Sequence, residues 1–191
     1  MYLKAGKAFL HCKSGACKGD EAIHSLRSST LSTPMGEMVA IADEEALYLL
    51  DFASDPGLES KMRKLQKETN QTISPGKTAI LDQIEDELKN YFLSKGSPFS
   101  TPFVFIGTPF QQQVWSAVKH VPLGETRSYA EIAKNIGNPK AVRAVGSANG
   151  ANLLTIVIPC HRIIGSHGQL GGYASGLCRK KRLLDHEAKL V

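Results

Sequence analysis

Apolar positions near the start of the chain come in short runs that are separated by turn-forming residues. Between residues 28 and 52 the first break carries Pro34 and Gly36, and the second is the acidic stretch of residues 43–45. Short apolar runs bounded by such residues are typical of β-strands joined by tight turns. The pattern therefore predicts a small antiparallel meander in this segment.

The pattern then changes to a helical period, over residues 58–68 and again over residues 78–94. In the second segment the apolar residues recur at steps of three and four, which places them on one face of a helix. They are Ile80, Leu81, Ile84, Leu88, Tyr91 and Phe92. The stretch SKGSPFSTPF ends this pattern with one glycine and two prolines, and we interpret it as a linker between two domains.

The second half of the chain is predicted to be mainly helical. A helix is expected over residues 109–121, with Thr108 as its N-cap and a proline at its first position. Another is expected over residues 128–136, followed by a break at GNP and a restart at Pro139. Two short helices joined by a tight, glycine-containing turn are typical of a helix-turn-helix. The last predicted helix covers residues 177–189.

These elements predict an α/β protein in three parts. Residues 1–26 show no clear period and are interpreted as an extension of uncertain order. Residues 27–98 are expected to form an N-terminal α/β domain, with a small antiparallel sheet and helices. Residues 99–191 are expected to form a mainly helical domain that carries the helix-turn-helix. A chain of 191 residues has room for two small domains with a core each.

Charge is distributed unevenly between the two halves. Residues 1–98 hold 12 Lys and Arg against 14 Asp and Glu, a net charge of −2, whereas residues 99–191 hold 11 against 4, a net charge of +7. A positive half joined to a mildly acidic one is expected where one half meets a polyanion such as nucleic acid. The alternative is a basic face that meets only solvent.

Cysteine usage and hydropathy indicate where the protein acts. The four cysteines, at positions 12, 17, 160 and 178, are too few and too scattered for the disulfide frame of a small secreted domain, so we interpret them as thiols. No run reaches the 18 or more apolar residues of a membrane span, and the first residues lack the apolar core of a signal peptide. We therefore expect a cytoplasmic protein with no membrane partner.

The sequence IPCHR places Cys160 beside His161, between two apolar runs. A free cysteine has a pKa of roughly 8.5, so a base is needed to populate the thiolate at neutral pH. Neighbouring residues of an extended segment point in opposite directions, so we expect His161 to act through a water molecule. Pro159 restricts the loop and favours rigid support for a reactive group. The alternative is a buried structural cysteine beside a core histidine.

The predicted helix after GNP, with the sequence PKAVRAVGSANGAN, is rich in small residues. Such residues would let the backbone approach a groove closely, and Arg143 is the one long cation near its middle. The alternative is a helix whose small residues pack against other helices. Further along, we interpret the RKKR run at residues 179–182 as a solvated face. Cys178 is expected to be structural, and Arg162 to be a loop or interdomain clamp.

These motifs together resemble those of the O6-alkylguanine-DNA alkyltransferases, also called methylated-DNA--protein-cysteine methyltransferases. The resemblance is close over residues 99–188, from GTPFQQQVW to RLLDHEA with PCHR between, and looser over residues 27–98, where it depends on STPMGEM and the order of elements. It implies a ribonuclease H-like first domain and a winged-helix-like second domain. Within the family PCHR is a highly specific motif.

The resemblance also implies a reaction. Cys160 would accept an alkyl group, His161 would take the thiol proton through a water molecule, and Glu187 would orient His161. A nucleophile, a base and a group that fixes the tautomer of the base form a coherent relay. A buried O6-alkyl group is reached only when the nucleotide leaves the stack. The thioether has no easy leaving group, so each protein would react once.

Further site residues follow by position. Arg143 matches the family's arginine that replaces the flipped nucleotide, and Tyr129 matches the tyrosine that helps rotate the phosphate and protonates the leaving purine. Tyr173 matches a tyrosine of the guanine pocket, and Asn152 matches the asparagine that braces the turn before the active-site loop. Three more positions are assigned by location: Ala144 and Ser147 to the DNA-binding helix, and Ala174 to the pocket, where the family often has serine.

The implied partner is double-stranded DNA that contains O6-alkylguanine, mainly O6-methylguanine with O4-methylthymine as a further candidate, and the implied state is a monomer without cofactor. Some family members bind zinc in the first domain. The only nearby candidates here are irregularly spaced, so we predict no metal. They are His11, Cys12, Cys17 and His24. Two alternatives stay open: a helix-turn-helix protein that recognises alkylated DNA without repairing it, and a cysteine hydrolase that uses Cys160, His161 and Glu187.

Overall fold

A computed structural model describes residues 25–93 and 98–191. Nearly all of the predicted extension, and with it the four candidate zinc ligands, lies outside the described residues. The predicted meander is confirmed: β1 (Leu26–Thr33), β2 (Gly36–Ala42) and β3 (Leu47–Phe52) pair antiparallel. A fourth strand, β4 (Ile73–Pro75), pairs with β1 in parallel, so the sheet order is β3-β2-β1-β4.

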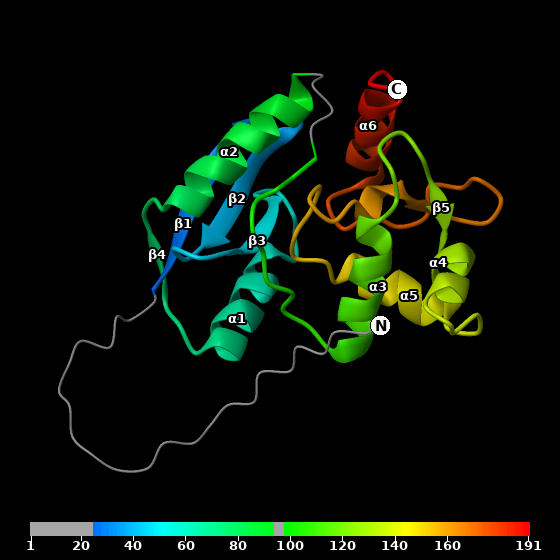
Figure 1. The fold of residues 1–191 in the computed structure, drawn as a ribbon, viewed down its shortest axis with the longest axis horizontal. Helices are drawn as coiled ribbons and strands as arrows, with labels where there is room; N and C mark the ends of the chain where they lie inside the picture. The colour runs from blue at the N-terminus through cyan, green and yellow to red at the C-terminus, as the bar shows by residue number, and fades with distance from the viewer. Residues whose placement is uncertain (1–24, 94–97) are drawn as a thin grey trace, which may run out of the picture.

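Two helices cover opposite faces of this sheet (Figure 1). Side chains alternate across a strand, and in β2 Met38 and Ala40 belong to one buried cluster whereas Ile41 belongs to another. The first cluster contains the apolar face of α2 (Ala79–Phe92), and the second contains Leu65 of α1 (Leu58–Thr69). Both helices lie where the three-and-four-residue period predicts them.

The second half contains four α-helices among the described residues: α3 (Pro109–Lys119), α4 (Tyr129–Asn135), α5 (Val142–Gly150) and α6 (Leu177–Glu187). Capping boxes fix the starts of α3 and α4. Thr108 accepts from the Gln111 N–H, and Ser128 accepts from the Glu131 N–H, while each N3 side chain bonds back to the cap. The predicted N-cap at Thr108 is therefore confirmed.

The predicted restart of the helix at Pro139 is wrong. A turn occupies residues 137–141, with Gly137 in the left-handed region at φ 74° and a bond from the Ala141 N–H to the Asn138 carbonyl, and α5 begins only at Val142. Two two-residue strands, β5 (Arg127–Ser128) and β6 (Ile163–Ile164), pair in parallel beside these helices. Pairs this short leave no alternation in the sequence by which to predict them.

One apolar cluster contains residues of both halves. Phe52, Ile84 and Tyr91 of the first half share it with Trp115, Val118, Ile158 and Leu183 of the second. The segment interpreted as a linker also pairs with β3, because the Leu47 N–H donates to the Pro102 carbonyl at 2.8 Å. Among the described residues, no helix is long and apolar enough to cross a membrane.

Candidate active site

The nucleophile candidate lies on a tight turn and not on the extended segment that we expected. The chain before it is bound to β3, since Leu50 donates to the Leu153 carbonyl and accepts from the Thr155 N–H, both at 2.8 Å. After Pro159, residues Cys160–Arg162 form a 3-10 turn, η1. The Cys160 N–H donates to the Ile158 carbonyl at 2.7 Å, a bond that extended backbone could not make. The turn directs His161 into the protein, where it is fully buried.

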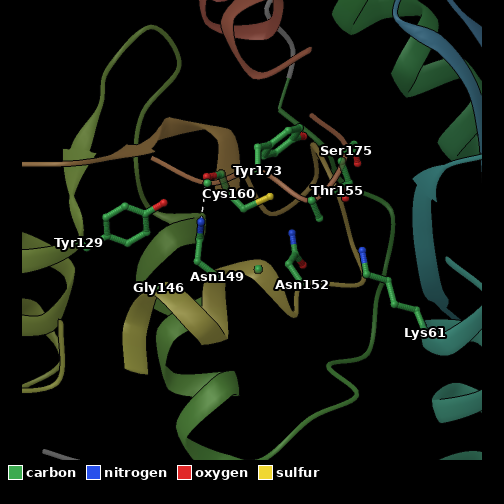
Figure 2. Close-up of a pocket in the computed structure, with 12 residues that line it drawn as sticks. Lys61, Tyr129, Gly146, Asn149, Asn152, Thr155, Cys160, Tyr173 and Ser175 are labelled. Atoms are coloured by element: carbon green, nitrogen blue, oxygen red, sulfur yellow. Dashed lines mark hydrogen bonds between the residues drawn. The ribbon is translucent and has the colours of Figure 1, made fainter. Parts of the chain in front are cut away.

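The Cys160 thiol opens onto a cavity of about 360 Å³. In Figure 2 its sulfur points into the space between Tyr173, Thr155 and Asn152. The cavity is lined by residues of α1, α4, α5, the active-site loop and the loop before α6: Lys61, Tyr129, Gly146, Asn149, Gly150, Asn152, Thr155, Cys160, Gly172, Tyr173, Ala174 and Ser175. Five residues that the sequence assigned to the site therefore meet at one cavity: Cys160, Tyr129, Tyr173, Asn152 and Ala174.

Two asparagines hold the active-site turn. Asn152 donates from Nδ2 to the Ile158 carbonyl at 3.0 Å and accepts from the Leu154 N–H at 2.9 Å, so it lies where a brace of this turn is expected. Asn149 donates to the Cys160 carbonyl at 3.1 Å (Figure 2). The sequence reading did not single out Asn149, because an amide in a helix of small residues gives no sign of the loop that it will meet.

Burial decides the protonation of the two adjacent groups. Burial raises the pKa of the Cys160 thiol, with the Asn152 amide acting in the opposite direction, so the sulfur holds its proton at neutral pH. Burial likewise lowers the pKa of His161, although the Glu187 carboxylate opposes this, so the imidazole is neutral. A protonated thiol beside a neutral imidazole is the resting state from which a general base acts.

Glu187 of α6 holds the imidazole from its far side. Its Oε1 is 2.8 Å from His161 Nε2, and among the described residues His161 Nδ1 is buried without a hydrogen-bond partner. Arg162 donates to both carboxylate oxygens, from Nε at 2.8 Å and from Nη2 at 2.9 Å. Burial alone would raise the pKa of Glu187, but the bonds from His161 and Arg162 hold it well below the usual range. Glu187 is therefore an ionised carboxylate, and Nδ1 is the ring nitrogen that can accept a proton.

Arg162 is a loop clamp within the second half. Besides Glu187 it binds the Val121 carbonyl, which receives a bond from Nη1 at 2.6 Å. The Tyr91 hydroxyl, from α2, also donates to Glu187 Oε1, at 2.7 Å. The sequence counted Tyr91 only among the apolar residues of a helix face.

In Figure 2 the Tyr173 ring lies directly above the thiol, and Tyr129 lies further to the left, at another part of the cavity wall. Tyr129, the first residue of α4, is half-buried, and burial raises its pKa. The Tyr173 hydroxyl is buried without a hydrogen-bond partner in the described part of the chain, and burial raises its pKa well above the usual value. Both phenols therefore keep their protons and can act as hydrogen-bond donors toward a ligand in the cavity.

The helix α5 has a buried face and an exposed face. They correspond to the two interpretations of its small residues, packing against other helices and close approach to a groove. Val145 and Ala148 are buried, and the Ala148 carbonyl accepts from Trp115 Nε1 of α3 at 2.8 Å. Arg143, Ala144 and Ser147 lie together on the exposed face. Within residues 25–93 and 98–191 the Arg143 side chain makes no ion pair or hydrogen bond. Packing thus explains one face of α5 and leaves the other available to a partner.

The expectation of a solvated RKKR face is wrong for Arg179 and Lys180, whereas Lys181 and Arg182 are exposed as expected. Lys180 is fully buried and donates to the carbonyls of Ile163 and Leu170. Arg179 is half-buried and donates to the Met35 carbonyl of the first half, and the exposed Arg182 donates to the Pro34 carbonyl. The sequence of this run shows that it is basic, but it does not show which side of the helix will pack against the rest of the protein.

Cys178, which was expected to be structural, is exposed. The next two residues of α6, Arg179 and Lys180, bind backbone carbonyls of the protein, whereas the Cys178 side chain faces solvent. An isolated cysteine in a charged run gives no sign of the face on which it will lie.

The first half contributes an ionic cluster to the cavity that the sequence did not reveal. Lys61 of α1 forms ion pairs with Asp51 and Asp55 of the β3 region. Each carboxylate also accepts a hydrogen bond from a hydroxyl of the cavity wall. Thr155 donates to Asp51 at 2.9 Å, and Ser175 donates to Asp55 at 3.0 Å. The cavity is therefore built by both halves of the chain.

Comparison with known proteins agrees with this site. Residues 109–189 match the family model described as 6-O-methylguanine DNA methyltransferase, DNA binding domain. The constitutive methylated-DNA--protein-cysteine methyltransferase of Bacillus subtilis is 40% identical over 156 residues, which cover 82% of this chain and 91% of that protein. The methylated-DNA--protein-cysteine methyltransferase of Mycobacterium tuberculosis is 51% identical over 144 residues, which cover 72% and 85%.

Similar structures give the same result. The crystal structure of Mycobacterium tuberculosis OGT in complex with DNA is 37% identical, covers 87% of this chain and 94% of that one, and has a TM-score of 0.73. Fold, site and relatives define a DNA-binding methyltransferase, and the chain belongs to the 6-O-methylguanine DNA methyltransferase family. Its enzyme class is that of the methylated-DNA--protein-cysteine methyltransferases, which makes it a DNA repair protein.

Proposed function

We propose that this protein flips O6-alkylguanine, mainly O6-methylguanine, out of duplex DNA and transfers the alkyl group irreversibly to Cys160. The observation that carries the proposal is the buried thiol at the floor of the cavity, next to a neutral His161 whose other nitrogen is held by Glu187. A cavity of about 360 Å³ falls in the range of small-molecule sites and has room for a single base.

The proton and the bonds can be followed through the transfer. His161 Nδ1 takes the Cys160 proton through a water molecule, and Glu187 stabilises the imidazolium at Nε2. The sulfur then forms a bond to the alkyl carbon while the bond from that carbon to O6 breaks. The leaving purine takes a proton from Tyr129, whose pKa is raised and which lies at the cavity wall. Cleaving the thioether again would require a poor leaving group, so the protein is consumed.

The DNA partner is assigned to the exposed face of α5. We propose that α4, the turn at Gly137 and α5 form a helix-turn-helix within a winged-helix-like unit, and that the sheet with α1 and α2 is ribonuclease H-like. Arg143 would occupy the gap left by the flipped nucleotide, with Ala144 and Ser147 against the groove. Asn152 braces the loop, and Tyr173 and Ala174 line the base pocket. The protein would act as a monomer in the cytoplasm and without a cofactor.

Intact-mass measurement tests the transfer directly. After incubation with an excess of duplex that contains O6-methylguanine, the protein should gain the mass of one methyl group, on the peptide that contains Cys160, and then stop reacting. Cys160→Ser should gain none while it still binds the duplex. Repeated turnover would favour the cysteine hydrolase, and binding without any mass gain would favour a protein that only recognises the lesion.

A further inference from the structure

The carboxylate that holds His161 receives a hydrogen bond from the other half of the molecule. The Tyr91 hydroxyl, on α2, donates to Glu187 Oε1 at 2.7 Å across a sequence separation of 96 residues. Tyr91 is 1% exposed and Glu187 is fully buried, so water does not compete for this bond. No part of the proposed transfer requires a tyrosine at this place.

The two oxygens of Glu187 are used unequally. Oε1 receives three donors, which are Tyr91, His161 and Arg162 Nη2 at 2.9 Å, whereas Oε2 receives only Arg162 Nε. Tyr91 and His161 therefore draw on the charge of one oxygen. A stronger bond from either one weakens the hold of that oxygen on the other.

Tyr91 is held firmly in this position. Its ring packs against Phe92 at 4.9 Å between centroids and against His186 at 5.2 Å, both in edge-on geometry. His186 Nε2 also lies 3.0 Å from the Tyr91 carbonyl, so α6 contacts both the ring and the backbone of this residue. A hydroxyl fixed from several sides is suited to setting the position and charge of its acceptor.

We propose that Tyr91 is a positioning residue of the transfer reaction: by sharing Glu187 Oε1 with His161, its hydroxyl limits how strongly the carboxylate favours the imidazolium and so keeps His161 available as a base. The proposal rests on the proposed function of Cys160 and His161. It assigns to the first half of the chain, which carries none of the reacting groups, an influence on the proton transfer.

The other charges around His161 determine the direction of the effect. Glu187 favours the charged imidazolium, while Arg162 of η1 and Lys180 of α6 disfavour it. On the side of the cavity, the neighbour of His161 is Cys160. From α2, Tyr91 affects His161 only indirectly, through its hydrogen bond to Glu187. If the tyrosine hydroxyl is removed, Oε1 presents more negative charge to His161, and protonation of the ring becomes easier.

Tyr91→Phe tests this with the pH dependence of alkyl transfer from the free base O6-benzylguanine, which avoids pH effects on DNA binding. The fall in rate on the acid side should move to higher pH by about one unit, because a hydrogen bond to a charged group contributes an energy of that order. Tyr48→Phe is the matched control. It removes the same kind of bond, from a tyrosine to Asp43 Oδ2 at 2.8 Å. Tyr48 packs against the apolar cluster that contains α1, whereas Tyr91 belongs to the cluster that contains α2, so Tyr48→Phe should leave the pH profile unchanged.

A lower melting temperature without a shifted acid limb would mean that Tyr91 only supports the fold, and the proposal would be wrong. If Tyr91→Phe does not fold, 3-fluorotyrosine introduced at position 91 keeps the shape and is a stronger donor, so the acid limb should move to lower pH. An unchanged limb there would also overturn the proposal.

Failure of the proposed function has a separate signature, since wild-type protein would then show no transfer to Cys160 at any pH. In that case the imidazole nitrogen shifts of His161, followed by NMR titration, still report its protonation. A titration midpoint that is the same in wild type and Tyr91→Phe would contradict the role given to Tyr91.

Discussion

At the scale of single residues, the site depends on a buried charge with every partner in place. Glu187 has no solvent exposure, and its oxygens receive bonds from His161, Arg162 and Tyr91. Removing one partner of a buried ion pair is costly because it leaves the other charge without compensation. Changes at Glu187 should therefore affect both the reaction and the fold.

Glu187→Gln is expected to slow alkyl transfer and to lower the free energy of unfolding by about 3–5 kcal/mol, because Arg162 stays buried without a counter-ion. Urea denaturation measures the loss of stability, and a single-turnover rate measures the slower alkyl transfer. Glu59→Gln is the control, since Glu59 pairs with Arg63 on the exposed side of α1 and should change stability by less than about 1 kcal/mol. Equal rates for Glu187→Gln and wild type would remove Glu187 from the mechanism.

The sequence predicted the residues of the site better than their contacts. Cys160, His161 and Glu187 could be named from the PCHR motif and a family resemblance, and the structure brings the three together. Tyr91 and Lys61 could not be named, because each reaches the site across a long sequence separation from a helix with its own periodic pattern. A periodic pattern shows that a side chain is buried but not which group it meets.

At the scale of elements, α5 has one face that packs against other helices and one that is exposed. Its buried face is fixed by α3 and α4, and its exposed face presents one long cation, Arg143. Unstacking a nucleotide costs a few kcal/mol, and a side chain that fills the gap offsets part of this cost. The function proposed for Arg143 therefore concerns duplex substrates alone.

Arg143→Ala should slow transfer from O6-methylguanine in duplex DNA much more than transfer from free O6-benzylguanine, which needs no flipping. Arg143→Lys should fall between wild type and Arg143→Ala, because lysine keeps the charge but loses the planar fork of donors. Rates for the three proteins on both substrates decide the matter. Parallel losses on the two substrates would show that Arg143 supports the fold or the pocket.

Long helices with a clear periodic pattern or a capping signal were predicted well, whereas the shortest strands were not predicted. The start of α3 followed from Thr108 and Pro109, since a cap and a proline at the first position are local signals. The start of α5 was placed three residues early because Pro139 resembles a first helical residue but lies in a turn. Strands β4, β5 and β6 have two or three residues each, too few for a pattern.

At the scale of the whole molecule, charge and packing divide the chain differently. The net charge is −2 over residues 1–98 and +7 over residues 99–191, yet one apolar cluster contains residues of both halves. Isolating the basic half would expose the surface around Ile158 and Leu183 that the first half covers. The electrostatic contribution of each half is therefore best measured in the full chain.

Affinity for undamaged duplex should fall steeply with salt, because binding releases counter-ions from phosphates. Lys140, exposed just before α5, is expected to contact a phosphate, so Lys140→Ala should reduce the slope of log affinity against log salt by about 1. Lys67→Ala, an exposed change at the end of α1, is the control and should leave the slope unchanged. Equal slopes for all three proteins would place the DNA elsewhere.

In the proposed mechanism, the position of Glu187 in the chain also determines when the relay beside Cys160 can be complete. During synthesis Cys160 is made before α6, so a growing chain carries the thiol without the carboxylate that orients its base. Because Glu187 and Tyr91 meet only when α6 packs against α2, the proposed relay can be complete only in a chain whose last helix has been made and has folded onto the first half.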